Sequence, residues 1–133
     1  MKYQNQNGLA IIKTVVLVTG SIILALVIFM SVMSANAKAR DVRRISDIKQ
    51  ITDALKLYYD YNQRYPETVE NQPKDITKYM QYWPQAPNAD GGCTKENNQY
   101  KYQQTEGGQS YVLSFCLGKG ANGYAAGYYQ IKP

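Results

Sequence analysis

The sequence predicts an α+β protein in which one long N-terminal helix packs on a small three-stranded antiparallel sheet. Three observations predict this fold: an apolar run near the start, a polar continuation with helical periodicity, and alternating residues near the end. The chain has 133 residues, enough for one small domain beside the apolar run. It carries a net charge of +5, 13 tyrosines and no histidine.

The apolar run extends from Thr14 to Met33 without a charged residue. Its length matches the roughly 20 residues that a helix needs to cross a bilayer. A cleaved secretory signal is the alternative, because residues 34–37 resemble a small-residue cleavage site. Such signals have a shorter apolar core, so an uncleaved membrane helix is the favoured interpretation.

Two positions in this segment leave alternatives open. Lys13 is either a lysine that reaches the headgroups and marks the start of the span, or a functional charge among neighbouring helices. Gly20, with Ser21 and Ala25, either forms a face for close helix packing or is a small residue tolerated in lipid.

After Met33 the sequence turns polar but keeps the period of a helix. Apolar residues at steps of three and four form one stripe: Val42, Ile45, Ile48, Ile51, Leu55 and Tyr58. The helix should end near Asn62, just before Arg64-Tyr65-Pro66, because the residue before a proline avoids helical backbone. A helix from Leu9 to Asn62 would be on the order of 80 Å long.

Basic residues cluster just past the apolar run: Lys38, Arg40, Arg43, Arg44 and Lys49. We interpret the cluster as a solvated helix face, since Asp41 and Asp47 dilute it; a nucleic-acid site is the weaker alternative. The positive-inside rule would place this side of the membrane span in the cytoplasm. The cysteines indicate the opposite orientation.

The two cysteines, Cys93 and Cys116, both follow the apolar run. Without histidine or a nearby carboxylate cluster they are too few for a zinc site. A disulfide formed outside the cytoplasm is the favoured interpretation, and two buried free thiols are the alternative.

The rest of the chain predicts a head with a thin core. Residues 66–92 should be mostly loop, with one short helix between Pro73 and Pro84 and Trp83 as a core anchor rather than a ligand platform. The period then changes to two, which predicts three strands of a meander, at 100–103, 110–117 and 124–131. A turn at 106–108 and a loop at 118–123 would connect them. Cys116 would point away from the helix.

Asn7-Gly8 followed by LAIIKTVVLVTG resembles the processing site of type IV prepilins and type II secretion pseudopilins. The passage RDVRRISDIKQITDALKLYYDYNQRYP is similar to the helix-to-loop passage of that group. The end, GGCTKENNQYKYQQTEGGQSYVLSFCLGKGANGYAAGYYQIKP, is similar to its disulfide-bearing sheet. The resemblance implies a pilin-like fold, cleavage by a prepilin peptidase between Gly8 and Leu9, and methylation of Leu9 as the new amino terminus.

This resemblance implies four segments: a leader at 1–8, a transmembrane or filament-core half-helix at 9–33, an amphipathic half-helix at 34–62, and residues 63–133, which form the globular head with 34–62. One position departs from the family pattern. Family members usually carry a glutamate at the fifth mature residue, which is thought to pair with the amino terminus of a neighbouring subunit. Here that position is Lys13, which cannot do so and indicates a minor or atypical subunit.

The expected function is that of a structural subunit of a type IV pilus or a type II secretion-like filament. The implied partners are copies of itself or related pilin subunits, the prepilin peptidase, the inner membrane and the assembly machinery. The expected location is a single pass through the inner membrane with the head outside the cytoplasm, and after assembly an extracellular or periplasmic filament.

The alternative function is a membrane-anchored or tip-located module that binds DNA, a surface or a protein. It is motivated by the net positive charge and by six tyrosines: Tyr100, Tyr102, Tyr111, Tyr124, Tyr128 and Tyr129. Tyrosines that alternate along strands more often pack in sheets than stack on bases.

We expect no enzyme, no catalytic residue, no cofactor and no bound metal. Histidine is absent, both cysteines are expected to be bridged, and the loop carboxylates are scattered, at Asp75, Asp90, Glu96 and Glu106. The loop at 118–123 contains no carboxylate to hold calcium.

Overall fold

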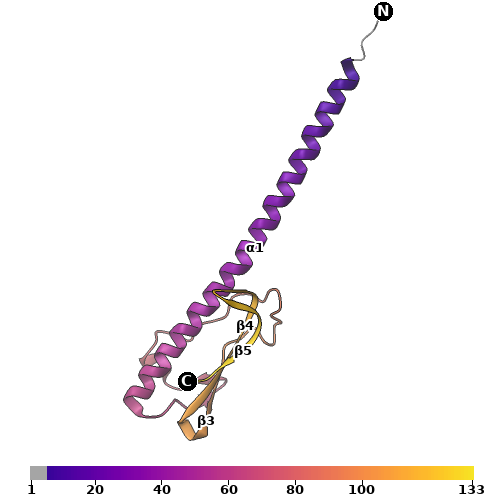
Figure 1. Cartoon of the computed structure of the whole chain (residues 1–133). Helices are drawn as coiled ribbons and strands as arrows, with labels where there is room; N and C mark the ends of the chain where they lie inside the picture. Colours follow the sequence, from indigo (N-terminus) through magenta and orange to yellow (C-terminus); the bar gives the residue numbers. More distant parts are fainter. Residues whose placement is uncertain (1–5) are drawn as a thin grey trace, which may run out of the picture. The chain divides into compact units, whose positions relative to one another are not determined.

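The computed structural model describes residues 6–133, and the chain divides into two compact units. The N-terminal unit ends at Asn36, and the second unit, which we call the head, is Ala37–Pro133. Helix α1, Gln6–Asn62, contributes residues to both units (Figure 1). The predicted end of the helix at Asn62 is confirmed, and its first turn begins earlier than the expected Leu9.

The head contains a three-stranded antiparallel sheet in the order β3-β4-β5, which confirms the α+β class and the predicted meander. Its strands are β3 (Lys101–Thr105), β4 (Ser110–Ala121) and β5 (Tyr124–Ile131). A hairpin of β1 (Thr68–Val69) and β2 (Gln72–Pro73) lies against β3. The turn η2 (Glu106–Gly108) connects β3 to β4 at the expected place.

The predicted loop at 118–123 is wrong for most of its length. Strand β4 continues to Ala121 through a register shift between Leu117 and Gly120. Asn122 and Gly123 alone make the turn, with φ angles of 51° and 88°. Two successive residues with positive φ match the twist of the flanking strands, and Asn-Gly adopts that backbone readily.

The predicted short helix between Pro73 and Pro84 is also wrong. Only one 3-10 turn forms, η1 (Ile76–Lys78), because Pro73 pairs with Thr68 in the hairpin and Asp75 has a φ of 59°. The predicted packing is right, since Ile76 is buried and Trp83 packs half-buried against the core.

The core of the head lies between the second part of α1 and the sheet. Helix residues Ile48, Ile51 and Leu55 pack in one cluster with alternate residues of β4, namely Tyr111, Leu113, Phe115 and Leu117. The predicted stripe is therefore confirmed from Ile45 onward, whereas Val42 is 41% exposed and lies outside the core.

Candidate functional site

The first candidate region is the apolar part of α1. Its large apolar side chains, from Ile11 to Met33, are all more than half exposed, so the chain itself does not cover them. By length and composition α1 can cross a membrane. Its hydroxyl groups donate to carbonyls of the same helix, as Thr14 does to Ala10 and Ser31 to Val27. Hydroxyls bound in this way suit an apolar surrounding, because their O–H groups already have a hydrogen-bond acceptor and need no water.

The implied processing site lies at the start of this helix. Gly8 and Leu9 are in the first turns of α1. Of the implied leader, residues 1–5, including Lys2, lie outside the described residues. Cleavage after Gly8 and methylation of Leu9 stay predictions.

Lys13 is exposed on the apolar part of α1. The sequence contains no Asp or Glu before Asp41, so no acidic residue lies near Lys13 along the sequence. Both interpretations of Lys13 stay predictions. At Gly20 an added Cβ would meet no atom of the described residues within 4 Å, so its small size serves no contact among them.

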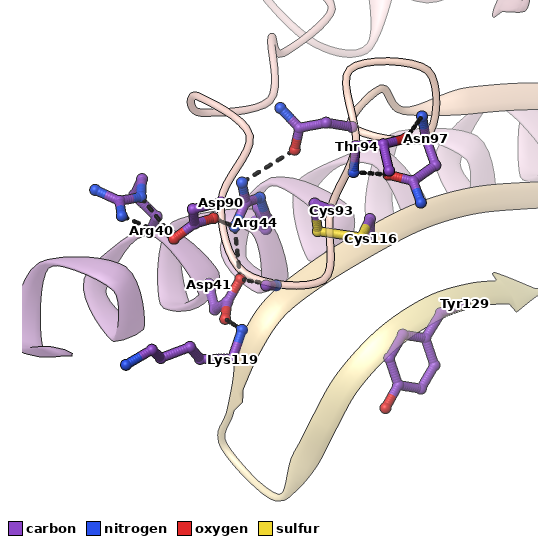
Figure 2. The surroundings of a disulfide bond; sticks show 12 residues. Arg40, Asp41, Arg44, Asp90, Cys93, Thr94, Asn97, Cys116, Lys119 and Tyr129 are labelled. Carbon is purple, nitrogen blue, oxygen red and sulfur yellow. Dashed lines mark hydrogen bonds and ion pairs between the residues drawn. A yellow bond between two sulfur atoms is a disulfide. The ribbon is translucent and has the colours of Figure 1, made fainter.

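The second candidate region is the disulfide between Cys93 and Cys116 (Figure 2). It confirms the favoured pairing, and the described residues contain no free cysteine. The cysteines are 23 positions apart in the sequence, so the bond stabilises the head by about 3 kcal/mol on the chain-entropy model. Backbone bonding supports the same loop, because the Gly92 N–H donates to Gly118 O at 3.0 Å.

Glycine at 118 permits this close approach. A Cβ at that position would lie 2.5 Å from the backbone oxygen of Asp90, so a side chain would push the loop away from β4. The loop that contains Asp90 and Cys93 is thus held against the strand by a covalent bond, a backbone hydrogen bond and a close packing contact.

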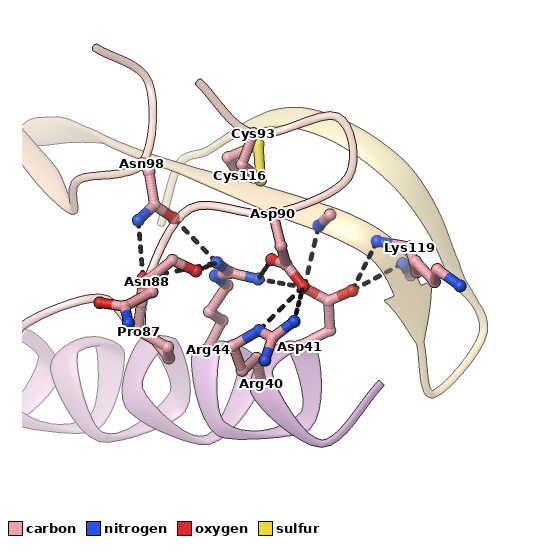
Figure 3. A network of polar contacts seen from close by, with 12 residues as sticks. Arg40, Asp41, Arg44, Pro87, Asn88, Asp90, Cys93, Asn98, Cys116 and Lys119 are labelled. Atoms are coloured by element: carbon pink, nitrogen blue, oxygen red, sulfur yellow. Dashed lines mark hydrogen bonds and ion pairs between the residues drawn. A yellow bond between two sulfur atoms is a disulfide. The ribbon is translucent and has the colours of Figure 1, made fainter. Parts of the chain in front are cut away.

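The third region is a buried ionic network around Arg44 (Figure 3). Its guanidinium is fully buried and donates from Nη1 to Asp41 Oδ1 at 2.6 Å and to Asp90 Oδ1 at 2.9 Å. Its Nη2 donates to Asn88 O at 2.9 Å and to Asn98 Oδ1 at 3.0 Å. The interpretation of the basic cluster as a solvated face is therefore wrong for Arg44.

Arg40 joins the network from one turn earlier in α1. Its Nε and Nη2 donate to Asp90 Oδ2 at 2.9 and 2.8 Å. Asp90 was expected to be a scattered loop carboxylate, but it bridges two arginines of the helix. The network therefore ties the loop before Cys93 to α1.

Asp41 ties β4 to the same helix. Its carboxylate is fully buried and accepts three backbone N–H groups, from Gly118 at 2.9 Å and from Lys119 and Gly120 at 2.8 Å each. Burial alone would raise the pKa of Asp41. The hydrogen bonds from Lys119, Gly118, Arg44 and Gly120 outweigh burial and hold the pKa below its ordinary value.

The tyrosines divide between the core and the surface. Tyr100, Tyr102 and Tyr111 are buried, and the Tyr100 hydroxyl donates to Asp47 Oδ2 at 2.8 Å. Burial raises the pKa of Tyr111 to about 12. Packing in the core is confirmed for these three, of which Tyr102 and Tyr111 lie on strands, whereas Tyr124 and Tyr128 are about half exposed on β5. A nucleic-acid surface stays a weakly supported prediction.

Sequence reasoning missed the buried charges of α1. Asp41, Arg44, Ile48, Ile51 and Leu55 follow one another at steps of three and four, so the two charges continue the buried stripe. That spacing was a usable signal, since charged residues on the buried face of a helix need partners. The partners themselves come from loops remote in sequence.

The described residues contain no group of three or more His, Cys, Asp and Glu side chains that suits a metal ion. The carboxylates of Asp41 and Asp90 are occupied by arginine and backbone donors. The expected lack of catalytic, cofactor-binding and metal-binding residues stays a prediction. Comparisons with protein-family models, curated proteins and solved structures gave no match.

Proposed function

We propose that this chain is a structural subunit, major or minor, of a type IV pilus or a type II secretion-like filament. The observation that carries the proposal is helix α1, in which an exposed apolar part is followed by an amphipathic part that packs on a disulfide-bearing sheet. In this function the apolar parts leave the bilayer and pack together in a filament core. The heads form the filament surface.

The disulfide supports a head outside the cytoplasm. Such bonds persist in oxidising compartments and are rare in the cytosol. Before assembly the chain then passes once through the inner membrane.

Lys13 supports a minor or atypical subunit rather than a self-assembling major one. A lysine at the fifth position after Gly8 cannot neutralise the amino terminus of an incoming subunit. In this proposal another subunit type supplies the usual pairing, and this chain joins a mixed filament.

Mass spectrometry of the amino terminus tests the proposal. Protein isolated from membranes or filaments should begin at Leu9 and carry one added methyl group. Replacement of Gly8 by Val should leave Met1 in place, because the peptidase reads the residue before the cut. The matched control is Gly20→Ala, a glycine change in the same helix, which should be processed normally.

Two outcomes would contradict the proposal. An intact Met1 on the wild-type membrane-bound protein would exclude processing after Gly8. A new amino terminus close to Ala37 would identify the apolar segment as a cleaved secretory signal. Electron microscopy of surface filaments, with their peptide composition, then separates a major from a minor subunit.

A further inference from the structure

The two edges of the head's sheet differ in how they are covered. The β1–β2 hairpin lies against β3, where the Tyr102 N–H donates to Asn71 O at 2.8 Å. Among the described strands, β5 pairs with β4 alone and so forms the opposite edge. Strand β5 contains no charged residue and no proline, the devices that usually protect an exposed edge from pairing.

An apolar groove of about 310 Å³ lies between α1 and this edge of the sheet. Most of its lining is apolar or aromatic: Ile45, Ile48, Phe115, Tyr124 and Ile131. Lys49 is the one charged residue that lines it, and no carboxylate in the described part of the chain forms an ion pair with Lys49. Such a groove fits an apolar side chain with a carboxylate beside it.

The β1–β2 hairpin presents that combination at the other edge of the sheet. Val69 is 51% exposed, and Glu70 beside it is exposed as well. Glu70 and Asn71 form a two-residue turn with φ angles of 49° and 62°, which holds both side chains at the surface. Glu67 is engaged by Lys74 at 3.6 Å, whereas Glu70 forms no ion pair within residues 6–133.

We propose that the hairpin of one copy docks in the groove of the next copy. Val69 enters the apolar groove and Glu70 pairs with Lys49. The proposal rests on the proposed filament function and specifies how neighbouring heads contact each other. Because the two surfaces lie at opposite edges of one sheet, the contact is heterologous and adds copies in a row instead of closing a dimer.

The contact is small, so it aligns heads that are already concentrated by their apolar segments. Linked modules meet at a high effective concentration, and a weak second contact then becomes populated. The expected readout is therefore contact between chains held in a membrane or filament, not association of dilute chains.

Cysteine cross-linking of the full chain in its membrane tests the contact. The variant Thr52→Cys with Gln72→Cys keeps Lys49, Val69 and Glu70 in place, with one cysteine at the groove and one on the exposed side of the hairpin. Treated with a short bismaleimide, it should give a ladder of dimers, trimers and larger species on a denaturing gel. The matched control, Thr52→Cys with Glu106→Cys, places the second cysteine at an exposed acid outside the hairpin and should stay monomeric. No ladder, or dimers alone, would overturn the proposal.

Charge reversal provides a second readout. The reporter pair Thr52→Cys with Gln72→Cys leaves both charges and Val69 in place. Adding Lys49→Glu or Glu70→Lys should each lower the cross-linked yield about five-fold or more, and the double reversal should restore it. A cross-linked yield that is unchanged by the single reversals, or that the double reversal does not restore, would exclude the ion pair.

The amino terminus, read in the same samples, separates this proposal from the proposed function. An intact Met1 together with a ladder would refute the filament function and keep the contact. A start at Leu9 without a ladder would refute the contact and keep the filament function.

Discussion

A soluble helix usually buries its apolar side chains and exposes its charged ones, and the two parts of helix α1 depart from this arrangement in different ways. In the first part apolar side chains are exposed, with Leu17 at 74%, and in the second part charged side chains are buried, with Arg44 at 0%. The second part receives its partners from its own head. Among the described residues the first part has exposed apolar side chains, and by length and composition it can cross a membrane. The following predictions test this difference, from the largest effect to the smallest.

The largest effect is expected from removing the buried cation. Arg44→Ala leaves the carboxylates of Asp41 and Asp90 without their shared partner, and breaking a buried ion pair in this way costs about 3–5 kcal/mol. Urea unfolding of the full chain in mild detergent, followed by Trp83 fluorescence, measures the loss. The control Arg43→Ala, at an exposed neighbour, should change stability by less than about 0.5 kcal/mol. Equal losses in both variants would mean that the network is not the source.

A charge introduced into the first part of α1 should lower membrane insertion, whereas the same charge in the second part should not. Leu24→Asp places a carboxylate near the middle of the apolar run, where insertion costs about 3 kcal/mol, or roughly a hundred-fold in the membrane equilibrium. Leu57→Asp changes a similarly exposed leucine in the head and should have no such effect. The fraction of chain that resists carbonate extraction measures insertion. Unchanged extraction of Leu24→Asp would argue against a membrane segment.

A smaller loss is expected where a buried carboxylate of α1 meets the sheet. Tyr100→Phe removes the hydrogen bond to Asp47 and should lower the free energy of unfolding by about 1.5–3 kcal/mol. Tyr128→Phe, at an exposed residue, should leave it unchanged. The same urea titration compares them. If the two variants match, the Asp47 contact contributes nothing beyond packing of the ring.

The smallest effect concerns pH. Since the pKa of Asp41 is lower in the folded head than in the unfolded chain, its carboxylate stabilises the fold above the ordinary aspartate pKa of about 3.9. That contribution is lost as the pH falls through the lowered value. Asp41→Asn should therefore have a lower unfolding midpoint at pH 5 and a shallower decline toward pH 2. Asp53→Asn, at an exposed site, should keep the wild-type decline, and identical slopes in all three proteins would refute this role.

Local patterns were sufficient for most elements of the fold. The end of α1, strand β5 and the disulfide follow from helix periodicity before Pro66, alternation after Gly123 and a single pair of cysteines. The loop predicted at 118–123 was wrong because β4 continues to Ala121 through a register shift, and Asn122-Gly123, which is itself a hairpin signal, makes the turn. The helix predicted after Pro73 does not form, because Pro73 pairs with Thr68 in the β1–β2 hairpin.

The sequence by itself determined the apolar segment, the amphipathic stripe and the meander, because these depend on side-chain patterns between near neighbours. Only the tertiary structure decided that Arg44 and Asp41 are buried, since their partners Asp90 and Gly118 lie far along the chain. It also decided that one edge of the sheet is covered and the other adjoins an apolar groove. A charged side chain on a helix is stable in water or beside buried polar partners, and only folding brings those partners together around Arg44 and Asp41.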